Sequence, residues 1–192
     1  MPEEIPLRPW KTLDRRLVYD HGKFLQVENH IVELPDGRII DDWAWVKIPD
    51  AAIVMARTLN GRFLCFRQTK YAIDGITYAP VGGMLEPGED PLVAARRELL
   101  EETGYTAPQW ISLGSYVLDP NRGVAVMHLY LALDAVPAAE PIRDDLEDQQ
   151  LLLLSQEEIQ QITEQGGFKD IAWAAAASLT LNYLISQSPN RS

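Results

Sequence analysis

Residues 83–105 read GMLEPGEDPLVAARRELLEETGY, and this stretch decides most of what the sequence says about the fold. A helix is predicted from about Pro91 to Thr103. Proline at the first helical position loses no hydrogen bond, and Gly104 supplies the C-terminal stop. We expect the apolar side of this helix to face the core, and its members are Leu92, Val93, Leu99 and Leu100.

The other side of the predicted helix is strongly acidic. At about 100° per residue, Glu98, Glu101 and Glu102 fall within one arc of about 100°. Carboxylates gathered in this way repel one another unless a cation lies among them, and Mg²⁺ prefers such oxygen ligands. The alternative is a solvated face braced by i, i+4 pairs such as Arg97 with Glu101. Neither interpretation explains Arg96, which projects toward the apolar side.

The same stretch resembles the Nudix box, G-x5-E-x7-R-E-U-x-E-E-x-G-U, in which U is a bulky apolar residue. Tyr105 is a mild departure, because an aliphatic residue is commoner there. Every invariant position is filled, by Gly83, Glu89, Arg97, Glu98, Glu101, Glu102 and Gly104.

The resemblance implies a hydrolase that needs Mg²⁺, with Mn²⁺ as an alternative. It implies that Glu98, Glu101 and Glu102 bind the metal with the backbone carbonyl of Gly82, and that Glu98 and Glu102 act in catalysis. It also implies that Arg97 pairs with Glu89 to hold loop and helix together. Metals in such sites neutralise the pyrophosphate and lower the pKa of the attacking water.

Outside the box, the pattern predicts an α/β (α+β) fold, in which helices sandwich a mixed sheet. The pair Asn60-Gly61 predicts a tight hairpin between two strands, and a glycine-rich loop leads to the helix. Leu151–Leu154 reads as a short buried strand. Further strands are expected at 51–56, 62–66, 110–118 and 124–133, and further helices at 156–164 and 169–186.

The N-terminal region predicts a separate small antiparallel sheet. Residues 1–12 carry three prolines and indicate an irregular arm, whereas residues 13–48 have strand-like texture with a hairpin at Pro35-Asp36-Gly37. We therefore divide the chain into residues 1–49 and a Nudix domain at 50–192. This layout resembles the branch of ADP-ribose pyrophosphatases and other nucleoside-diphosphate-sugar hydrolases, which implies a homodimer formed through the N-terminal sheet.

Two further features resemble that branch and imply residues that bind substrate. Arg67-Gln68-Thr69-Lys70 is similar to its R-Q-Y-R segment, which implies roles for Arg67 and Lys70. Pro120 lies 15 residues beyond Tyr105, where the branch usually has a proline. Residues 77–80 lack the branch's glutamate, and Ala125 stands where another is common, so other substrates stay open.

Two candidate groups lie elsewhere. In the acidic loop 144–148, Glu147 is the first choice for the general base and Asp145 the second, the alternative being a solvated loop. Trp43 and Trp45 flank one residue, so on a strand they share a face. They could stack a nucleobase, or form an interface or core stripe.

Composition narrows the class of protein. There are 17 Lys and Arg and 28 Asp and Glu, a net charge of −11, which is poorly suited to binding nucleic acid. The single cysteine, Cys65, is expected to be a buried strand residue and indicates a reducing compartment. No run is long enough to span a membrane, so we expect a cytoplasmic protein.

The predicted function is hydrolysis of a pyrophosphate bond in a nucleoside diphosphate derivative, with ADP-ribose or a related nucleotide sugar preferred. The alternatives are GDP-mannose, a dinucleoside polyphosphate or an oxidised nucleotide. A non-catalytic metabolite sensor on the same scaffold is a third hypothesis, although such sensors typically lose glutamates of the box.

Overall fold

The computed structural model describes residues 7–142 and 148–187 and divides into two compact units. The first comprises Met1–Pro49 together with Val117–Val126, and the second comprises Asp50–Tyr116 together with Met127–Ser192. The predicted division after residue 49 did not anticipate that the segment 117–126 belongs with the N-terminal residues. Within the described residues, no helix is both long and apolar enough to cross a membrane.

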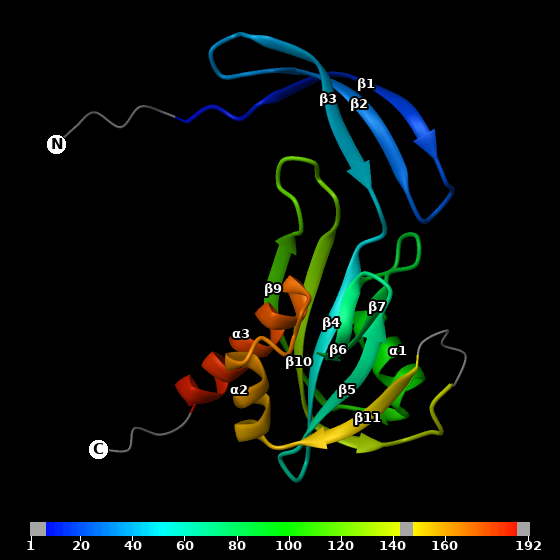
Figure 1. Ribbon diagram of the computed structural model, residues 1–192, viewed down its shortest axis with the longest axis vertical. Helices are drawn as coiled ribbons and strands as arrows, with labels where there is room; N and C mark the ends of the chain where they lie inside the picture. Colours follow the sequence, from blue (N-terminus) through cyan, green and yellow to red (C-terminus); the bar gives the residue numbers. More distant parts are fainter. Residues whose placement is uncertain (1–6, 143–147, 188–192) are drawn as a thin grey trace, which may run out of the picture. The chain divides into compact units, whose positions relative to one another are not determined.

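The first unit is built on a three-stranded antiparallel sheet in the order β1-β2-β3 (Figure 1). Its strands are β1 (Lys11–Asp20), β2 (Gln26–Glu33) and β3 (Ile39–Lys47). The hairpin predicted at residues 35–37 joins β2 to β3, with the Gly37 amide donating to the Leu34 carbonyl at 2.9 Å. The irregular arm was predicted too long, because β1 already begins at Lys11.

The segment 117–126 extends this sheet with backbone hydrogen bonds. The Val46 amide donates to the Arg122 carbonyl at 3.0 Å, and the Ile48 amide donates to the Val124 carbonyl at 3.2 Å. These bonds satisfy one donor at the end of β3 and one just after it, and β3 is otherwise an edge strand of its sheet.

The second unit has one mixed sheet. Its path runs β11-β5-β4-β10-β8, with β6 on β5, β7 on β4 and β9 on β10. The pairing of β10 with β4 is parallel, whereas the pairings of β5 with β4, β6 and β11 are antiparallel. The elements are β4 (Ala51–Thr58), β5 (Phe63–Lys70), β6 (Ile73–Ala79), β7 (Val81–Met84), α1 (Pro91–Thr103), β8 (Tyr105–Thr106), β9 (Gln109–Val117), β10 (Val126–Pro137), β11 (Gln149–Leu154), α2 (Gln156–Glu164) and α3 (Ile171–Gln187).

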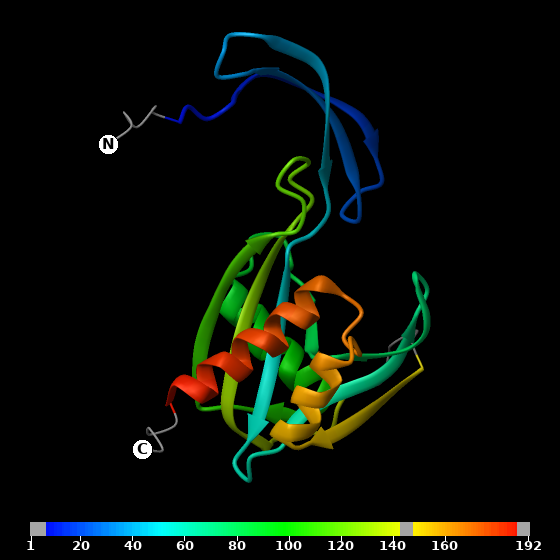
Figure 2. The ribbon, with the colours of Figure 1, turned by 60° about the vertical axis from the view of Figure 1, so that its left-hand side comes forward.

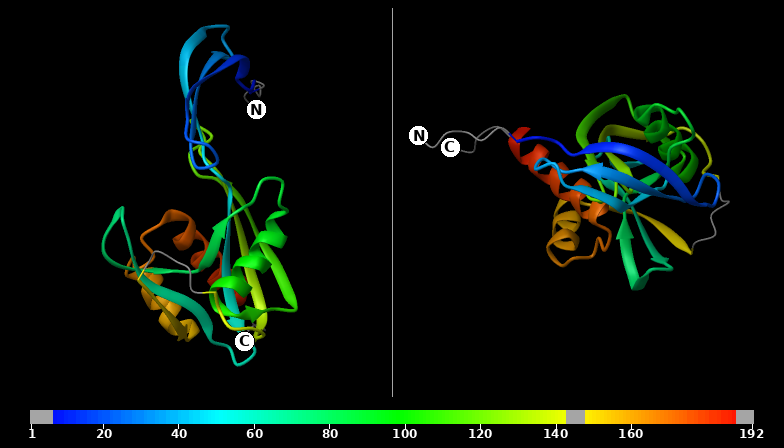
Figure 3. Two further views of the ribbon diagram at one scale, coloured as in Figure 1. Left: turned by 90° about the vertical axis from the view of Figure 1, so that its right-hand side faces the viewer. Right: turned by 90° about the horizontal axis from the view of Figure 1, so that it is seen from above.

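Strand β4 separates the two layers of the core because its side chains alternate between the faces of the sheet. Ile53 and Met55 pack in a cluster with residues of α2 and α3, and Ala52 and Val54 pack in a second cluster with residues of α1. Figure 2 shows α3 crossing one face of the sheet, and the left view of Figure 3 brings α1 forward on the other. The predicted helix–sheet–helix arrangement is confirmed.

Several local expectations need correction. Val93 and Leu100 were expected in the core but are 53% and 39% exposed, because α1 packs through Leu99 and two small alanines instead. Strand β11 is an edge strand rather than a buried one, and Leu151 and Leu153 are exposed. The glycine-rich loop proves to contain β6 and β7, whose glycines hid the strand pattern.

Candidate active site

Helix α1 holds most of the site, and both of its ends are secured locally. The Asp90 carboxylate accepts hydrogen bonds from the amides of Leu92 (2.9 Å) and Val93 (3.1 Å), which would otherwise lack partners at the helix start. Gly104 ends the helix in the left-handed conformation (φ 73°), and a Cβ there would lie 2.2 Å from the Ala139 carbonyl oxygen. The predicted bounds of the helix are confirmed at both ends.

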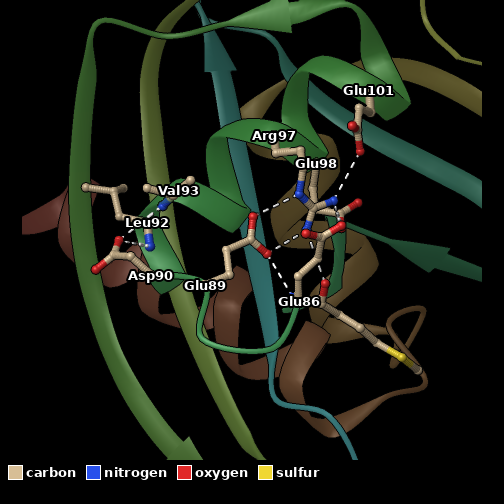
Figure 4. Close-up of polar contacts among 9 residues, drawn as sticks. Glu86, Glu89, Asp90, Leu92, Val93, Arg97, Glu98 and Glu101 are labelled. Atoms are coloured by element: carbon tan, nitrogen blue, oxygen red, sulfur yellow. Dashed lines mark hydrogen bonds and ion pairs between the residues drawn. The ribbon is translucent and has the colours of Figure 1, made fainter. Parts of the chain in front are cut away.

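Arg97 is the centre of the polar network on this helix (Figure 4). Its Nε and Nη2 donate to the two oxygens of Glu89, both at 2.9 Å, in the bidentate geometry that makes such pairs strong. Its Nη1 donates to Glu98 (2.7 Å) and Glu101 (3.1 Å), and Nη2 also reaches the Met84 carbonyl (3.2 Å). One guanidinium therefore fastens the loop before the helix to two of the helix carboxylates.

These contacts affect protonation. Hydrogen bonds from Arg97 and from the Glu86 amide lower the pKa of Glu89 to about 2, so this carboxylate stays ionised. Burial raises the pKa of Glu98, while Arg97 opposes the shift. The pKa of Arg97 itself is raised, chiefly by Glu89.

The Glu98 carboxylate lies directly over the backbone of Gly83. A Cβ at residue 83 would come within 2.4 Å of the Glu98 carboxyl carbon, so any larger residue would displace that group. Gly83 pairs with Ala52 of β4, which places this contact on the face of the sheet that α1 covers. The box glycine is therefore needed for a close approach between strand and helix.

Glu102 reaches the neighbouring residue of the same strand. Its Oε2 accepts a hydrogen bond from the Gly82 amide at 3.0 Å. Gly82 is confined by β4, because a Cβ there would lie 2.3 Å from the Ala52 carbonyl oxygen. The structure thus brings Glu98 and Glu102 to the Gly82–Gly83 backbone. The carboxylates of Glu98 and Glu101 are both also bound to Arg97.

The donor set suits a hard divalent cation. Glu98 and Glu102 supply carboxylate oxygens, and Mg²⁺ prefers oxygen ligands. Both carboxylates lie beside Gly82 and Gly83, where any side chain would clash with its surroundings. Among residues 7–142 and 148–187, no group of three or more His, Cys, Asp or Glu side chains is arranged to hold a metal ion. The two carboxylates fit the predicted role, and the full ligand set stays a prediction.

The remaining candidates lie on other elements. Arg67 is exposed and Lys70 partly exposed on β5, opposite Tyr78 and Ile73 of β6. In the first unit, the Trp43 Nε1 donates to the Asn121 carbonyl at 2.8 Å, and Pro120 is exposed in the segment 117–126. Asp145 and Glu147 lie outside the described residues, so their role as general base stays a prediction.

Some partners could not be found from the sequence. Arg96 lies 5.8 Å from the ring centroid of Trp110, a cation–π contact that explains why it points away from the carboxylates. Trp45 stacks on His30 and packs against Gly123, partners that are 15 and 78 residues away in sequence. No spacing rule links residues at such separations, because the tertiary structure brings them together.

Comparisons with known proteins show which family models and relatives this chain matches. A family model described as NUDIX domain matches residues 46–171, and one described as Nucleoside diphosphate sugar hydrolase N-terminal domain matches residues 10–46. The chain is 32% identical over 122 residues to "ADP-ribose pyrophosphatase" of Bacillus subtilis (strain 168), which covers 64% of this chain and 65% of that protein.

Two further similarities bear on the fold and on the range of relatives. The chain is 34% identical over 125 residues to "CMP-5'-(N-acetyl-N-hydroxy-3-aminopropyl)phosphonate hydrolase" of Streptomyces rubellomurinus (strain ATCC 31215), covering 64% of this chain and 59% of that protein. The chain thus spans about three fifths to two thirds of these relatives. "Crystal structure of ADP compounds hydrolase" matches with a TM-score of 0.77 at 19% identity, over 96% of this chain and 98% of that one, which shows the shared fold.

Proposed function

This chain belongs to the Nudix family, and we propose that it is a divalent-metal-dependent pyrophosphohydrolase acting on a nucleoside diphosphate linked to a second group. One observation carries the proposal: every invariant position of residues 83–105 is filled, and Glu98 and Glu102 meet at the Gly82–Gly83 backbone. This completeness argues against a non-catalytic sensor, because such sensors typically lose some of these carboxylates.

Glu98 and Glu102 are the residues that would hold the metal, with the Gly82 carbonyl and Glu101 as further candidates. A bound Mg²⁺ or Mn²⁺ supplies charge neutralisation for the pyrophosphate and a lower pKa for water. Arg97 holds the loop and the helix in register through Glu89, so that the carboxylates keep their positions.

The reaction requires a water to attack one phosphorus while the bridging P–O bond breaks and the departing phosphate keeps the electron pair. The proton released from the water passes to a carboxylate base. Glu147, with Asp145 as the second choice, is our candidate because both lie in the acidic segment just before β11.

We propose ADP-ribose or a related nucleotide sugar as the substrate. The matched N-terminal domain at residues 10–46 and the ADP-ribose pyrophosphatase relative support this choice. The phosphonate hydrolase relative keeps other nucleoside-linked substrates open as the second candidate. Arg67, Lys70, Trp43 and Pro120 are the residues that we expect to contact substrate.

A phosphate-release screen tests the function. Purified protein is incubated with ADP-ribose, GDP-mannose, other nucleotide sugars and a dinucleoside polyphosphate, with Mg²⁺ or Mn²⁺, and alkaline phosphatase then frees phosphate from monoester products. We expect release from ADP-ribose or a relative. Because EDTA also inactivates alkaline phosphatase, metal dependence is read separately, by chromatography of the first reaction, where EDTA should abolish the monoester products. Folded protein that turns over none of these compounds would refute the proposal and favour the sensor.

We also propose a cytoplasmic homodimer formed through the first unit. All ten residues of β1 are exposed, although they include Leu13, Leu17, Val18 and Tyr19. This strand is also an edge of its sheet, and an exposed apolar edge strand favours pairing with another chain. The lone buried Cys65, which has no partner for an intramolecular disulfide, suits a reducing compartment.

A further inference from the structure

Trp45 is partly buried and contacts residues of its own unit on two sides. Its ring stacks on His30 with the centroids 5.1 Å apart and an interplanar angle of 17°. The six-membered part of the indole packs against Gly123, where a Cβ would lie 1.9 Å from Cζ2 and 2.2 Å from Cη2. Both contacts occupy ring surface that a nucleobase would need for stacking.

The histidine under this ring is itself held in place. His30 is 3% exposed, and its Nε2 is 2.8 Å from Oε2 of Glu28. The other oxygen of Glu28 accepts a hydrogen bond from Lys47 at the end of β3. These contacts lower the pKa of Glu28, so the carboxylate that anchors His30 stays ionised. The His30 ring on which Trp45 stacks is therefore held against rotation by its contact with Glu28.

The segment opposite this ring, residues 117–126, follows β3 over several residues. Three backbone carbonyls of the segment accept hydrogen bonds from this side. The Asn121 carbonyl accepts from the Trp43 Nε1, the Arg122 carbonyl from the Val46 amide, and the Val124 carbonyl from the Ile48 amide. Asp119 closes the turn by accepting from the Asn121 amide at 2.9 Å and by pairing with the Arg122 side chain at 3.1 Å. Gly123 lies within this series, in contact with the Trp45 ring.

The register shapes a surface hollow of about 270 Å³. Trp43 and Ala44 line it from β3, and Asn121 and Arg122 line it from the segment 117–126. A one-residue slip of the segment would exchange the side chains that form half of this lining.

We propose that Trp45 is a positioning residue: stacked on His30 and packed against Gly123, it holds the segment 117–126 in register on β3. It thereby sets the hollow beside Trp43 and the placement of Pro120. These ring contacts argue against base stacking by Trp45, while Trp43 lines the hollow and meets the Trp10 ring edge-to-face with the centroids 5.0 Å apart. The effect on substrate rests on the proposed function, whereas the positioning itself does not.

Hydrogen exchange tests the positioning without any substrate. Gly123→Ala introduces a Cβ that clashes with Trp45, and Gly22→Ala is a matched control in the same unit. Both glycines have the same backbone strain (φ 60° and 61°), but a Cβ at residue 22 meets nothing within 4 Å. We expect the Val46 and Ile48 amides to exchange about tenfold faster in Gly123→Ala only, with exchange of β4 amides as the internal standard.

A double-mutant cycle identifies Trp45 as the partner. Trp45→Phe removes the ring atoms that the new Cβ would meet, so Gly123→Ala should have little further effect in that background. Equal effects of Gly123→Ala in both backgrounds, or exchange no faster than in Gly22→Ala, would overturn the proposal.

Kinetics then tests the consequence for substrate. With the substrate found by the phosphate-release screen, we expect Gly123→Ala to raise KM about tenfold with kcat within about twofold, because the metal carboxylates are untouched. Faster exchange with an unchanged KM would overturn the link to substrate while supporting the positioning. Inactive wild-type protein would count against the proposed function alone, and exchange would still decide the positioning.

Discussion

Glu102 joins helix α1 to the strand that leads into it. Its Oε2 accepts from the Gly82 amide, next to the residue whose missing side chain leaves room for Glu98. A carboxylate in this place both supports the strand and supplies a charged oxygen. Replacing it with the amide of equal shape separates these two contributions.

We predict that Glu102→Gln lowers kcat at least ~100-fold, the scale of losing one key electrostatic group. The variant should also bind Mn²⁺ more weakly in calorimetric titration. Glu140→Gln removes one charge at an exposed position and is the matched control, expected to match wild type. Undiminished turnover by Glu102→Gln at saturating Mg²⁺ would contradict the metal assignment.

At the scale of elements, α1 depends on its first turn, because the loop before it carries Glu89. Asp90 caps two amides, and the next turn presents Arg97 to that loop. The N-terminal end of the helix also carries a local sequence signal, because Asp90 followed by Pro91 is typical of a helix start.

Asp90→Ala should lower the free energy of unfolding by about 1 kcal/mol, because the Leu92 and Val93 amides lose their acceptor. Asp90→Asn retains a side-chain oxygen and should lose only a small part of this stability. Urea unfolding followed by circular dichroism measures both. Equal losses in the two variants would show that charge, rather than the capping hydrogen bonds, stabilises the helix.

At the scale of the whole molecule, the exposed apolar strand β1 predicts self-association. We expect sedimentation velocity at micromolar concentration to give a dimer, and Val18→Asp to shift it toward monomer by placing a charge in the interface. Val18 is 60% exposed, and Ile185→Asp on α3, at 65%, is the matched control. A wild-type monomer, or equal dissociation by both variants, would refute the dimer.

The sequence by itself determined the features that depend on local chemistry. The bounds of α1 follow from Pro91 and Gly104, the hairpin at residues 35–37 follows from its turn residues, and the acidic arc follows from helical periodicity. The ion pair between Arg97 and Glu89, which the resemblance to the Nudix box implies, is also present. These features involve neighbours in the chain or one helical surface, so residue types and spacing suffice.

Only the tertiary structure decided which partners complete each group. Val93 and Leu100 proved exposed because Ala94 and Ala95 allow α1 to pack closely on the sheet. Strands β6 and β7 were hidden by their glycines, of which Gly82 and Gly83 in β7 are needed for close approach to Ala52 and Glu98. Trp45 acquired His30 and Gly123 as neighbours because strand register and the return of residues 117–126 to β3 set those contacts, and neither follows from local sequence.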